Sequence, residues 1–429
     1  MSKVVLTSTP FHGHVAPFLA TAADLTRRGH EVLFYTGSRF EKQIAETGAR
    51  FVPYPADVDY DDRDLEATFP RRAGLSPLDR LAFDLKYVFS DPTPVHERRL
   101  QEILAAFPAT TVIGEPSSFG MLPIALRAPR SERPLILSLG ILPPTFESAD
   151  TAPFGPGLPP PSTEQERAQY AAMKPAVREA LADAQHHLEK IFESMGVSLP
   201  DFFRNSMVTV PDQWLQLTIP SFEYPRSDAP SGFRFIGALP ADNVGSYQLP
   251  EWWGTLGNRP VVVVTQGTLE NHDLTQLILP TIQALADLDV TVVAATARPD
   301  GPDALRAELG KVPNNVHLTG YVPFERLLPL SSLLITNAGY GGVQTALRHG
   351  VPLVVAGDTE DKPEVAARVA WSGVGVNLLT GRPDVPAIRK AVEKVLGNAA
   401  FKSRALDLQA EYLRHEPLET IAEIVERQA

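Results

Sequence analysis

Two histidines lie close together in the segment 8–19, and both are candidates for acid–base chemistry. His12 and His14 have side chains that ordinarily titrate near neutrality, so either ring could take a proton from a substrate hydroxyl. Glu115 follows a separate apolar run, and a carboxylate behind an imidazole would fix its tautomer and stabilise its charged form. A histidine that packs at a helix start and an exposed loop acid are the alternatives. The residues therefore support a dyad of His14 and Glu115 as a hypothesis.

Glycine-rich loops in the C-terminal half form a second group of candidates. Residues 336–342 read TNAGYGG and residues 266–268 read QGT, each directly after an apolar run. Backbone N–H groups at a helix start can bind an anion, and glycine permits close approach, so the two loops together could hold a diphosphate. Tight packing at a strand-to-helix turn is the alternative for either loop alone. The candidates are Gln266, Gly267, Thr268, Asn337, Gly339, Gly341 and Gly342.

Charged residues gather in a third segment, GDTEDKPE at 357–364. Its Glu360, Asp361, Lys362 and Glu364 could hydrogen-bond the vicinal hydroxyls of a sugar, or they could form a solvated helix start. The chain has no cysteine and no HExxH motif, which excludes thiolate catalysis and gives a metal site little support. We therefore expect neither a cofactor nor a metal.

Each candidate loop must be positioned by a strand that precedes it. Apolar runs at 4–8, 31–36, 111–113 and 134–139 predict strands in the first half, and residues 17–28 predict a helix with Pro17 in its first turn. Further strands are predicted at 261–265, 290–294, 316–318, 333–336 and 353–355, with a helix at 274–285. Strands that alternate with helices predict two α/β domains with parallel, doubly wound sheets, in which ligands bind outside the carboxyl ends of the strands. The first turn lacks GxGxxG, so dinucleotide binding there is not expected.

The domain boundaries follow from composition. Residues 220–240 are dense in proline, glycine and aromatics, so we predict a domain at 1–220, a linker at 221–250, a second domain at 251–403 and a helix at 404–429 that packs back on the first domain. The prolines of 142–161 predict a long rigid loop. After it, Pro175 should kink a helix that Gly196 ends.

The overall charge of the chain bears on whether it could bind nucleic acid. In 429 residues there are 39 Lys and Arg against 51 Asp and Glu, a formal charge of −12. Such an acidic chain is not expected to bind nucleic acid. Because it has neither a secretory signal pattern nor about 18 consecutive apolar residues, we expect a cytoplasmic protein without a membrane span.

Several of these motifs together resemble the bacterial family 1 glycosyltransferases, which act on macrolides, flavonoids and other lipophilic natural products. The resemblance covers essentially the whole chain, and its most specific part is YVPFERLLPLSSLLITNAGYGGVQTALRHGVPLVV at 321–355. The other matching segments are 11–32, 222–237 and 266–268. The resemblance implies a GT-B fold, in which two Rossmann-like domains face a cleft, and an inverting, metal-independent transfer of a sugar from a UDP- or dTDP-sugar to a hydroxyl.

The resemblance also assigns roles to residues. His14, spaced HxxP from Pro17, matches the base that deprotonates the acceptor, and Glu115 stands where the family usually has Asp. Asn337 replaces the histidine that contacts the diphosphate, and Lys362 replaces the glutamine that follows Asp361 in the pair that grips the sugar. Contacts to the nucleotide are implied for Tyr321, Val322, Thr268 and Gly342.

The acceptor is expected against the first domain, where apolar side chains offer a surface for a lipophilic molecule. The residues expected to contribute are Phe83, Tyr87, Phe89, Leu142, Phe146 and Phe154. Two alternatives from other classes are a noncatalytic nucleotide-sugar-binding or activator homologue and, with less support, a nucleotide-sugar epimerase. A monomer and a homodimer are both compatible with the sequence.

Overall fold

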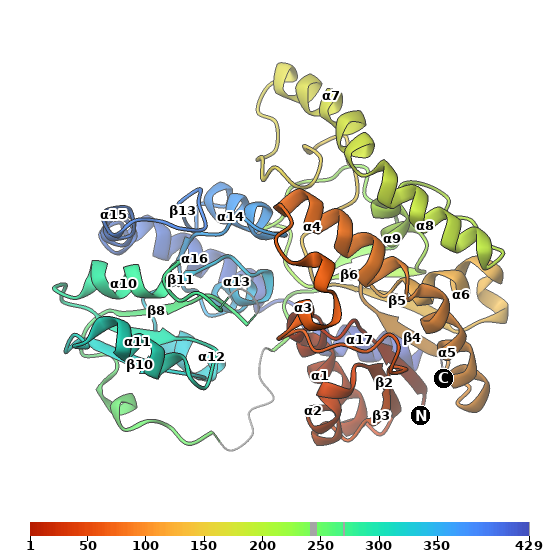
Figure 1. Ribbon diagram of the computed structural model, residues 1–429, viewed down its shortest axis with the longest axis horizontal. Helices are drawn as coiled ribbons and strands as arrows, with labels where there is room; N and C mark the ends of the chain where they lie inside the picture. The colour runs from red at the N-terminus through yellow and green to blue at the C-terminus, as the bar shows by residue number, and fades with distance from the viewer. Residues whose placement is uncertain (241–246, 269–270, 429) are drawn as a thin grey trace.

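The computed structural model describes residues 1–240, 247–268 and 271–428, which form two α/β domains (Figure 1). In the described part of the chain, the first domain contains a seven-stranded sheet in the order β3-β2-β1-β4-β5-β6-β7 and the second a six-stranded sheet in the order β10-β9-β8-β11-β12-β13. The first sheet consists of β1 (Lys3–Thr7), β2 (Glu31–Thr36), β3 (Arg50–Pro53), β4 (Thr111–Gly114), β5 (Leu135–Gly140), β6 (Gln213–Gln216) and β7 (Phe233–Phe235). The second consists of β8 (Val261–Thr265), β9 (Thr291–Ala295), β10 (Val316–Thr319), β11 (Leu333–Thr336), β12 (Leu353–Val355) and β13 (Gly375–Asn377).

All strand pairs in both sheets are parallel. In each sheet the first strand lies inside the sheet, and the chain extends first to one side of it and then to the other. This is the doubly wound arrangement. It confirms the predicted fold class of two Rossmann-like domains.

Within the described ranges, four strands lie outside the predicted set. They are β3, β6, β7 and β13, which have three or four residues each, and β7 falls within the segment 221–250 that we expected to be a linker. The side chains of β3 and β7 are half-buried or exposed, because these strands form the two edges of the first sheet. A short, incompletely buried strand leaves only a weak apolar pattern.

Helices connect the strands. The α-helices are α1 (His12–Arg27), α2 (Glu41–Glu46), α3 (Leu65–Thr68), α4 (Pro77–Phe83), α5 (Thr93–Ala106), α6 (Leu122–Arg127), α7 (Glu164–Ala180), α8 (Ala182–Ser194), α9 (Phe203–Thr209), α10 (Ile278–Leu285), α11 (Gly301–Leu309), α12 (Phe324–Leu327), α13 (Tyr340–Arg348), α14 (Lys362–Trp371), α15 (Val385–Leu396), α16 (Ala399–Tyr412) and α17 (Pro417–Glu426). A π-helical turn, η3, covers Asp84–Ser90, and the 3₁₀ turns are η1 (Ser38–Phe40), η2 (Pro70–Arg72), η4 (Phe119–Met121), η5 (Arg130–Glu132), η6 (Glu251–Thr255) and η7 (Leu328–Leu330).

Helix α1 begins earlier than the sequence predicts. It starts at His12, so Pro17 is an interior residue and His14 belongs to the first turn of the helix rather than to a loop. The carboxylate of Asp62 makes this start possible, because its Oδ2 accepts a hydrogen bond from the backbone N of His12 at 2.7 Å. The helix predicted to contain Pro175 and to end at Gly196 is two helices: α7 continues through Pro175, a break lies at Leu181, and α8 ends at Ser194.

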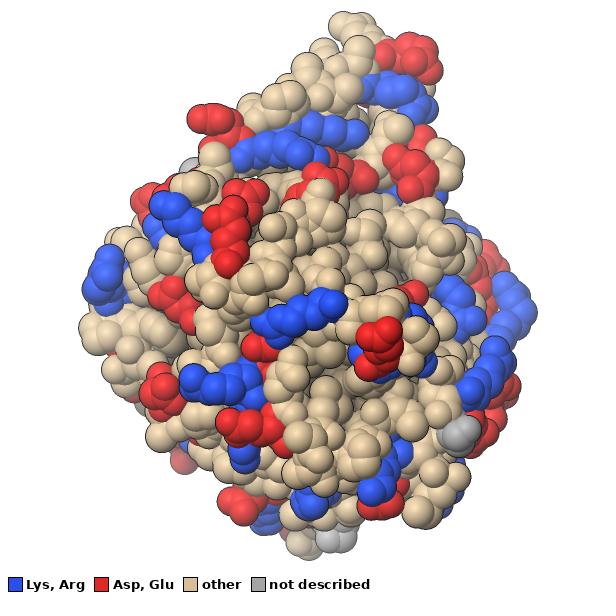
Figure 2. All heavy atoms as spheres, turned by 90° about the vertical axis from the view of Figure 1, so that its right-hand side faces the viewer, with Lys and Arg blue, Asp and Glu red and all other residues tan. Residues whose placement is uncertain are grey.

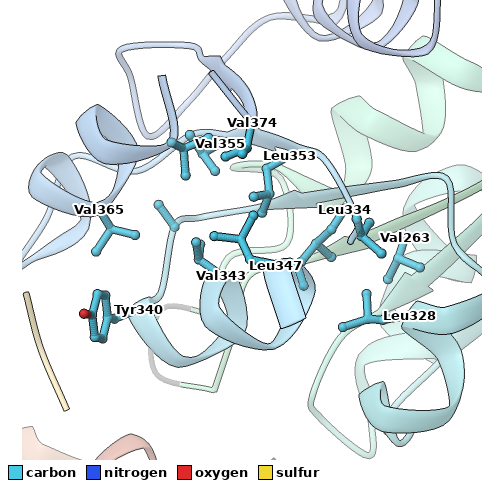
Figure 3. Close-up of a cluster of buried hydrophobic side chains, with 14 of the residues drawn as sticks. Val263, Leu328, Leu334, Tyr340, Val343, Leu347, Leu353, Val355, Val365 and Val374 are labelled. Atoms are coloured by element: carbon cyan, nitrogen blue, oxygen red, sulfur yellow. The ribbon is translucent and has the colours of Figure 1, made fainter. Parts of the chain in front are cut away.

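Each sheet is covered by apolar side chains on both faces. In the second domain, one face of the sheet packs on α13 and α14, and the other packs on α10 and α15. Figure 3 shows the first of these clusters. Its labelled side chains come from the strands, from α13 and α14, from η7 and from the residue before β13: Val263, Leu328, Leu334, Tyr340, Val343, Leu347, Leu353, Val355, Val365 and Val374. These buried faces hold the strand ends, and therefore the loops beyond them, in fixed positions.

The C-terminal segment forms two helices, although we predicted one. Leu408 and Tyr412 of α16 are buried in the core of the second domain. Ile421 and Val425 of α17 are buried in the core of the first domain, where Figure 1 shows the blue α17 among red and brown elements. The chain therefore returns to its starting domain through α17.

A buried polar network joins the two domains. The Nε of Arg368 in α14 donates to Oε2 of Glu223 at 2.7 Å, and its Nη1 donates to Oε2 of Glu364 at 2.9 Å. Oε1 of Glu364 accepts hydrogen bonds from the backbone N of Gly155 and Gly157 in the predicted proline-rich loop. Arg368 is fully buried and its guanidinium lies 4.1 Å from the ring centroid of Tyr224. Glu364 therefore connects α14 of the second domain to the loop of the first domain.

Charged side chains of both signs are distributed over the molecular surface. Figure 2 shows acidic and basic side chains interspersed over the visible face, with no continuous basic area among its described residues. Across the described ranges, no helix is both long and apolar enough to cross a membrane.

Candidate functional site

The candidate residues gather where each sheet reverses its strand order. In the first domain this point lies between β1 and β4, and in the second between β8 and β11. Thr9 and His14 follow β1, and Glu115 directly follows β4. Residues 266–268 follow β8, and Asn337 directly follows β11. Ligands in doubly wound sheets bind at such points, beyond the carboxyl ends of the strands.

The structure brings His14 and Glu115 together. Nδ1 of His14 lies 3.4 Å from Oε1 of Glu115 and 2.7 Å from Oγ1 of Thr9. The side chain of His14 is 15% exposed, whereas that of Glu115 is fully buried. The ring of His14 also packs on Phe11, with 5.3 Å between ring centroids. The other candidate, His12, is half-buried, and burial together with Arg39 lowers its pKa.

Glu115 is held as a carboxylate. Burial alone would raise its pKa, but His14 and the backbone N–H groups of Ser117 and Thr9 outweigh burial and hold the pKa of Glu115 below its ordinary value. Ser117 N donates to Oε2 at 2.6 Å, and Thr9 N donates to Oε1 at 3.1 Å. A buried carboxylate with this many donors keeps its charge and has little freedom to move.

Acidic groups of the second domain face His14. Asp361 and Glu360 precede α14, and the charge of His14 lowers the pKa of both carboxyl groups. Burial nevertheless raises the pKa of Asp361 to about 6, with Glu360 contributing to the rise and Lys362 opposing it. The imidazole of the first domain therefore lies within electrostatic range of the segment that we predicted to hold the sugar.

Lys362 is engaged with its neighbours. Its Nζ pairs with the carboxylate of Glu360 and lies 3.2 Å from Oγ1 of Thr359. Glu360 has a φ of 55°, a left-handed conformation that costs a side chain other than glycine about 1 kcal/mol or more. Glu364, which we also considered for the sugar, instead binds Gly155, Gly157 and Arg368.

Asn337 links the two predicted diphosphate loops. Its Nδ2 donates to the backbone O of Gln266 at 2.5 Å. The side chain of Gln266 is turned away from this junction: its Oε1 accepts from the backbone N of Leu277 and Ile278. The side chains of Asn337 and Gln266 are thus used to fix the loops, and the backbone of the loops remains the candidate contact for a donor.

The start of α13 provides open backbone. Among the described atoms, a methyl group built on Gly341 or Gly342 would meet nothing within 4 Å, whereas Gly339 caps the helix. Just before it, Ala338 has a φ of 67°, and Gly267 in the opposite loop has a φ of 70°. Glycine adopts this conformation without strain, whereas the strain at Ala338 persists only where the surroundings fix it, as is common at ligand-binding sites. The N-terminus of α13 and its dipole favour an anion.

Tyr321 and Val322 differ in environment. Tyr321 is 59% exposed, and its backbone O accepts a hydrogen bond from the hydroxyl of Tyr247 at 2.9 Å. Val322 is 3% exposed and belongs to the core of the second domain, so its side chain is structural. The exposed ring of Tyr321 has the surface that stacking on a base requires.

An apolar cluster lies beside His14. Phe11, Tyr60 and Val88 form its buried part, and Phe83 and Phe89 pack against them. The ring of Tyr87 lies 4.7 Å from that of Phe83. Tyr87, Val88 and Phe89 belong to the π-helical turn η3, a feature that often marks a functional site. Three of the six predicted acceptor residues are therefore at this cluster.

The other three lie elsewhere. Phe146 is 5% exposed and packs on Phe233 and Arg226 in the core, so it does not offer the apolar surface that we predicted. Phe154 is half-buried and lies 5.1 Å from the guanidinium of Arg204. Leu142 packs against the core of the first domain, and its backbone O accepts a hydrogen bond from Gln216.

Sequence reasoning missed two features of the site. One is Thr9, which no motif distinguishes beyond its place after a strand. The other is an ion pair at the edge of the apolar cluster, in which Arg72 donates to both oxygens of Asp84, at 2.8 and 3.0 Å. Arg72 also lowers the pKa of Glu360, which places this pair near the second domain. Arg72 and Asp84 are twelve positions apart, a spacing at which no local motif predicts an ion pair.

Comparisons with known proteins identify the family. Residues 280–427 match the family model of the erythromycin biosynthesis protein CIII-like C-terminal domain. The chain is 40% identical to UDP-glycosyltransferase 2 of Phaeomoniella chlamydospora, with 99% of this chain and 95% of that protein covered. It is 38% identical to 4'-demethylrebeccamycin synthase of Lentzea aerocolonigenes, with 99% of each covered. The crystal structure of the kitacinnamycin glycosyltransferase shares the fold, with a TM-score of 0.73, 22% identity and coverage of 100% of this chain and 98% of that one.

The identity over the full length, the two parallel doubly wound domains and the glycosyltransferase fold agree. The chain therefore belongs to the family 1 glycosyltransferases of the GT-B fold that modify natural products, and it is a glycosyltransferase.

Proposed function

We propose that the protein transfers a sugar from a UDP-sugar to a hydroxyl group of an apolar natural product, in one displacement that inverts the anomeric carbon. The position of His14 carries the proposal. This ring contacts Glu115 in the first domain and lies within electrostatic range of Asp361 in the second. A base at this position can contact an acceptor bound to the first domain and lies close to a donor sugar bound to the second domain.

In the proposed reaction, Nε2 of His14 takes the proton of the acceptor hydroxyl. The acceptor oxygen forms a bond to the anomeric carbon while the bond from that carbon to the diphosphate oxygen breaks, so the bonding electrons leave with the nucleoside diphosphate. The carboxylate of Glu115 stabilises the imidazolium that results. The acceptor attacks from the face opposite the leaving group, and the configuration therefore inverts.

The loops of the second domain would hold the donor. The open backbone at Gly341 and Gly342 lies at the N-terminus of α13, where N–H groups and the helix dipole favour the charge of a diphosphate. Tyr321 would stack on the base, and Asp361 would accept hydrogen bonds from sugar hydroxyls. A UDP-sugar is favoured over a dTDP-sugar because the fungal relative is named a UDP-glycosyltransferase. The proposal assigns no step to a metal, so activity should persist in excess EDTA.

The acceptor would lie on the apolar cluster of Phe11, Tyr60, Phe83 and Phe89. Aromatic rings recognise a flat apolar molecule through burial and edge contacts. The relative from Lentzea aerocolonigenes is named 4'-demethylrebeccamycin synthase, which supports a natural product as the acceptor. Phenols and polycyclic aromatic alcohols are therefore the acceptor class to test first.

Product analysis tests the proposal. UDP-glucose, UDP-glucuronate and a dTDP-sugar are each incubated with a panel of phenolic and macrolide acceptors, and products are identified by mass. We expect a sugar-mass adduct with a UDP donor and an aromatic acceptor, and NMR of the glucoside should show the β-anomer from the α-linked donor. An α-glucoside, or loss of activity in EDTA, would contradict the mechanism.

Donor affinity should depend on pH through Asp361. Because burial raises the pKa of Asp361 to about 6, the carboxyl gains a proton as the pH falls through that value. An ionised carboxylate accepts stronger hydrogen bonds from sugar hydroxyls than a protonated one. At pH 5 only about a tenth of the groups would be ionised, so the donor Kd should rise about tenfold between pH 7 and pH 5.

The matched variant is Asp361→Asn, whose amide does not titrate. Calorimetry with the UDP-sugar should give a weak donor Kd for this variant that stays nearly constant from pH 5 to pH 7. The wild type and the variant should therefore converge at low pH. An equally steep pH dependence in both proteins would exclude Asp361 as its source.

A further inference from the structure

The hydroxyl of Thr9 lies between the two members of the His14 and Glu115 pair. Oγ1 of Thr9 is 2.7 Å from Nδ1 of His14 and donates to Oε1 of Glu115 at 2.9 Å. The direct separation between Nδ1 of His14 and Oε1 of Glu115 is 3.4 Å. Because N–H···O hydrogen bonds are usually 2.7–3.2 Å long, the stronger connection between the two side chains passes through Thr9.

Counting protons fixes the direction of this connection. Glu115 is a buried carboxylate, so it accepts and does not donate. The single hydroxyl proton of Thr9 therefore points to Glu115, and the hydroxyl oxygen has a lone pair for His14. Nδ1 of His14 must then carry a proton and donate it to Thr9. In the neutral ring this leaves the lone pair on Nε2, the nitrogen that a base requires.

We propose that Thr9 is a positioning residue of the transfer reaction, whose hydroxyl bridges His14 to Glu115 and holds the imidazole in the tautomer with a proton on Nδ1. The inference rests on the proposed role of His14 as the base. It adds Thr9 as the middle member of a hydrogen-bonded chain from Glu115 to His14. The Thr9 hydroxyl orients the imidazole and connects it electrostatically to the carboxylate.

Glu115 cannot easily replace this bridge by moving toward His14. Its Oε1 accepts from Thr9 N at 3.1 Å and from Oγ of Ser118 at 3.1 Å, and its Oε2 accepts from Ser117 N at 2.6 Å. These donors hold both oxygens, and the side chain is fully buried. Loss of the Thr9 hydroxyl should therefore leave Nδ1 of His14 without a well-oriented acceptor.

Two substitutions test the bridge. Thr9→Val keeps the shape and removes the hydroxyl, and Thr9→Ser restores the hydroxyl. We expect Thr9→Val to lower kcat about 10- to 100-fold with little change in donor KM, as when an outer hydrogen-bond partner of a functional histidine is lost. Thr9→Ser should stay within about threefold of the wild type. The control is Thr21→Val, the same substitution at a buried hydroxyl of α1 that donates to the backbone O of Pro17 instead of Glu115, and it should retain most activity.

NMR of the protein labelled with ¹⁵N-histidine provides a reading that does not depend on turnover. Neutral His14 should show the proton on Nδ1 in the wild type and in Thr9→Ser, and a mixture of tautomers in Thr9→Val. A proton on Nε2 in the wild type, an unchanged spectrum in Thr9→Val, or a loss of kcat in Thr21→Val as large as in Thr9→Val would overturn the inference. Full activity of His14→Ala with the expected NMR result would instead refute the proposed base and leave the hydrogen-bonded bridge established.

Discussion

Replacement of His14 by alanine should lower kcat about 10²- to 10⁴-fold, which is the usual contribution of a general base. The variant loses the group that accepts the hydroxyl proton in the proposed reaction, whereas the donor loops lie in the other domain and keep their structure. The donor Kd measured by calorimetry should therefore change less than about threefold. Initial rates at saturating donor and acceptor give the change in kcat.

His12→Ala is the matched control for this experiment. His12 lies two residues away in the same helical turn, but within the described part of the chain Thr9 and Glu115 contact His14 and not His12. We expect the control to retain catalysis to within about tenfold. Similar kcat values for wild type and His14→Ala would remove the role of His14 as the base.

The second large effect should be on stability. Arg368→Met removes the cation that pairs with Glu223 and Glu364, which are 1% and 4% exposed. Two carboxylates would then be buried without their partner at the junction of the domains. The free energy of unfolding, measured by urea titration, should fall by about 3–5 kcal/mol.

An exposed arginine with the same pattern of partners provides the comparison. Arg389 pairs with Asp287 and Glu393 at the surface of α15. Water solvates these groups when the pair is broken, so Arg389→Met should change the free energy of unfolding by less than about 1 kcal/mol. Equal stability losses in the two variants would mean that burial of the Arg368 network has no special importance.

Much of the fold was predictable because the central strands are buried on both faces. The run Val261–Thr265 is continuous and apolar for this reason, and its predicted bounds are those of β8. Once the strands are placed, the loops after them follow, and the glycine-rich segments can be recognised as candidate sites. The same reasoning fails for β7 (Phe233–Phe235), because an edge strand with half-exposed side chains has no such signal.

The details of the site depend on contacts between distant residues. The start of α1 was missed because Phe11 caps it without a side-chain hydrogen bond, while Asp62, fifty residues away, accepts from His12. The hydrogen bond from Thr9 to Glu115 could not be predicted from motif spacing either, because the two residues are 106 positions apart in the sequence. Local patterns report burial and helix propensity, whereas these contacts arise only when the sheet brings two loops together.

The position of α17 has a consequence for biosynthesis. Ile421 and Val425 fill part of the first domain's core, Oγ of Ser2 donates to the backbone O of Val425, and Arg28 pairs with Glu419. At translation rates of about 5–20 residues per second, the ribosome makes α17 roughly 20–80 s after β1. Until then the apolar side chains that α17 covers have no native partner. The core of the nascent first domain therefore stays incomplete while the second domain is synthesised. During that interval chaperones can bind its exposed apolar side chains.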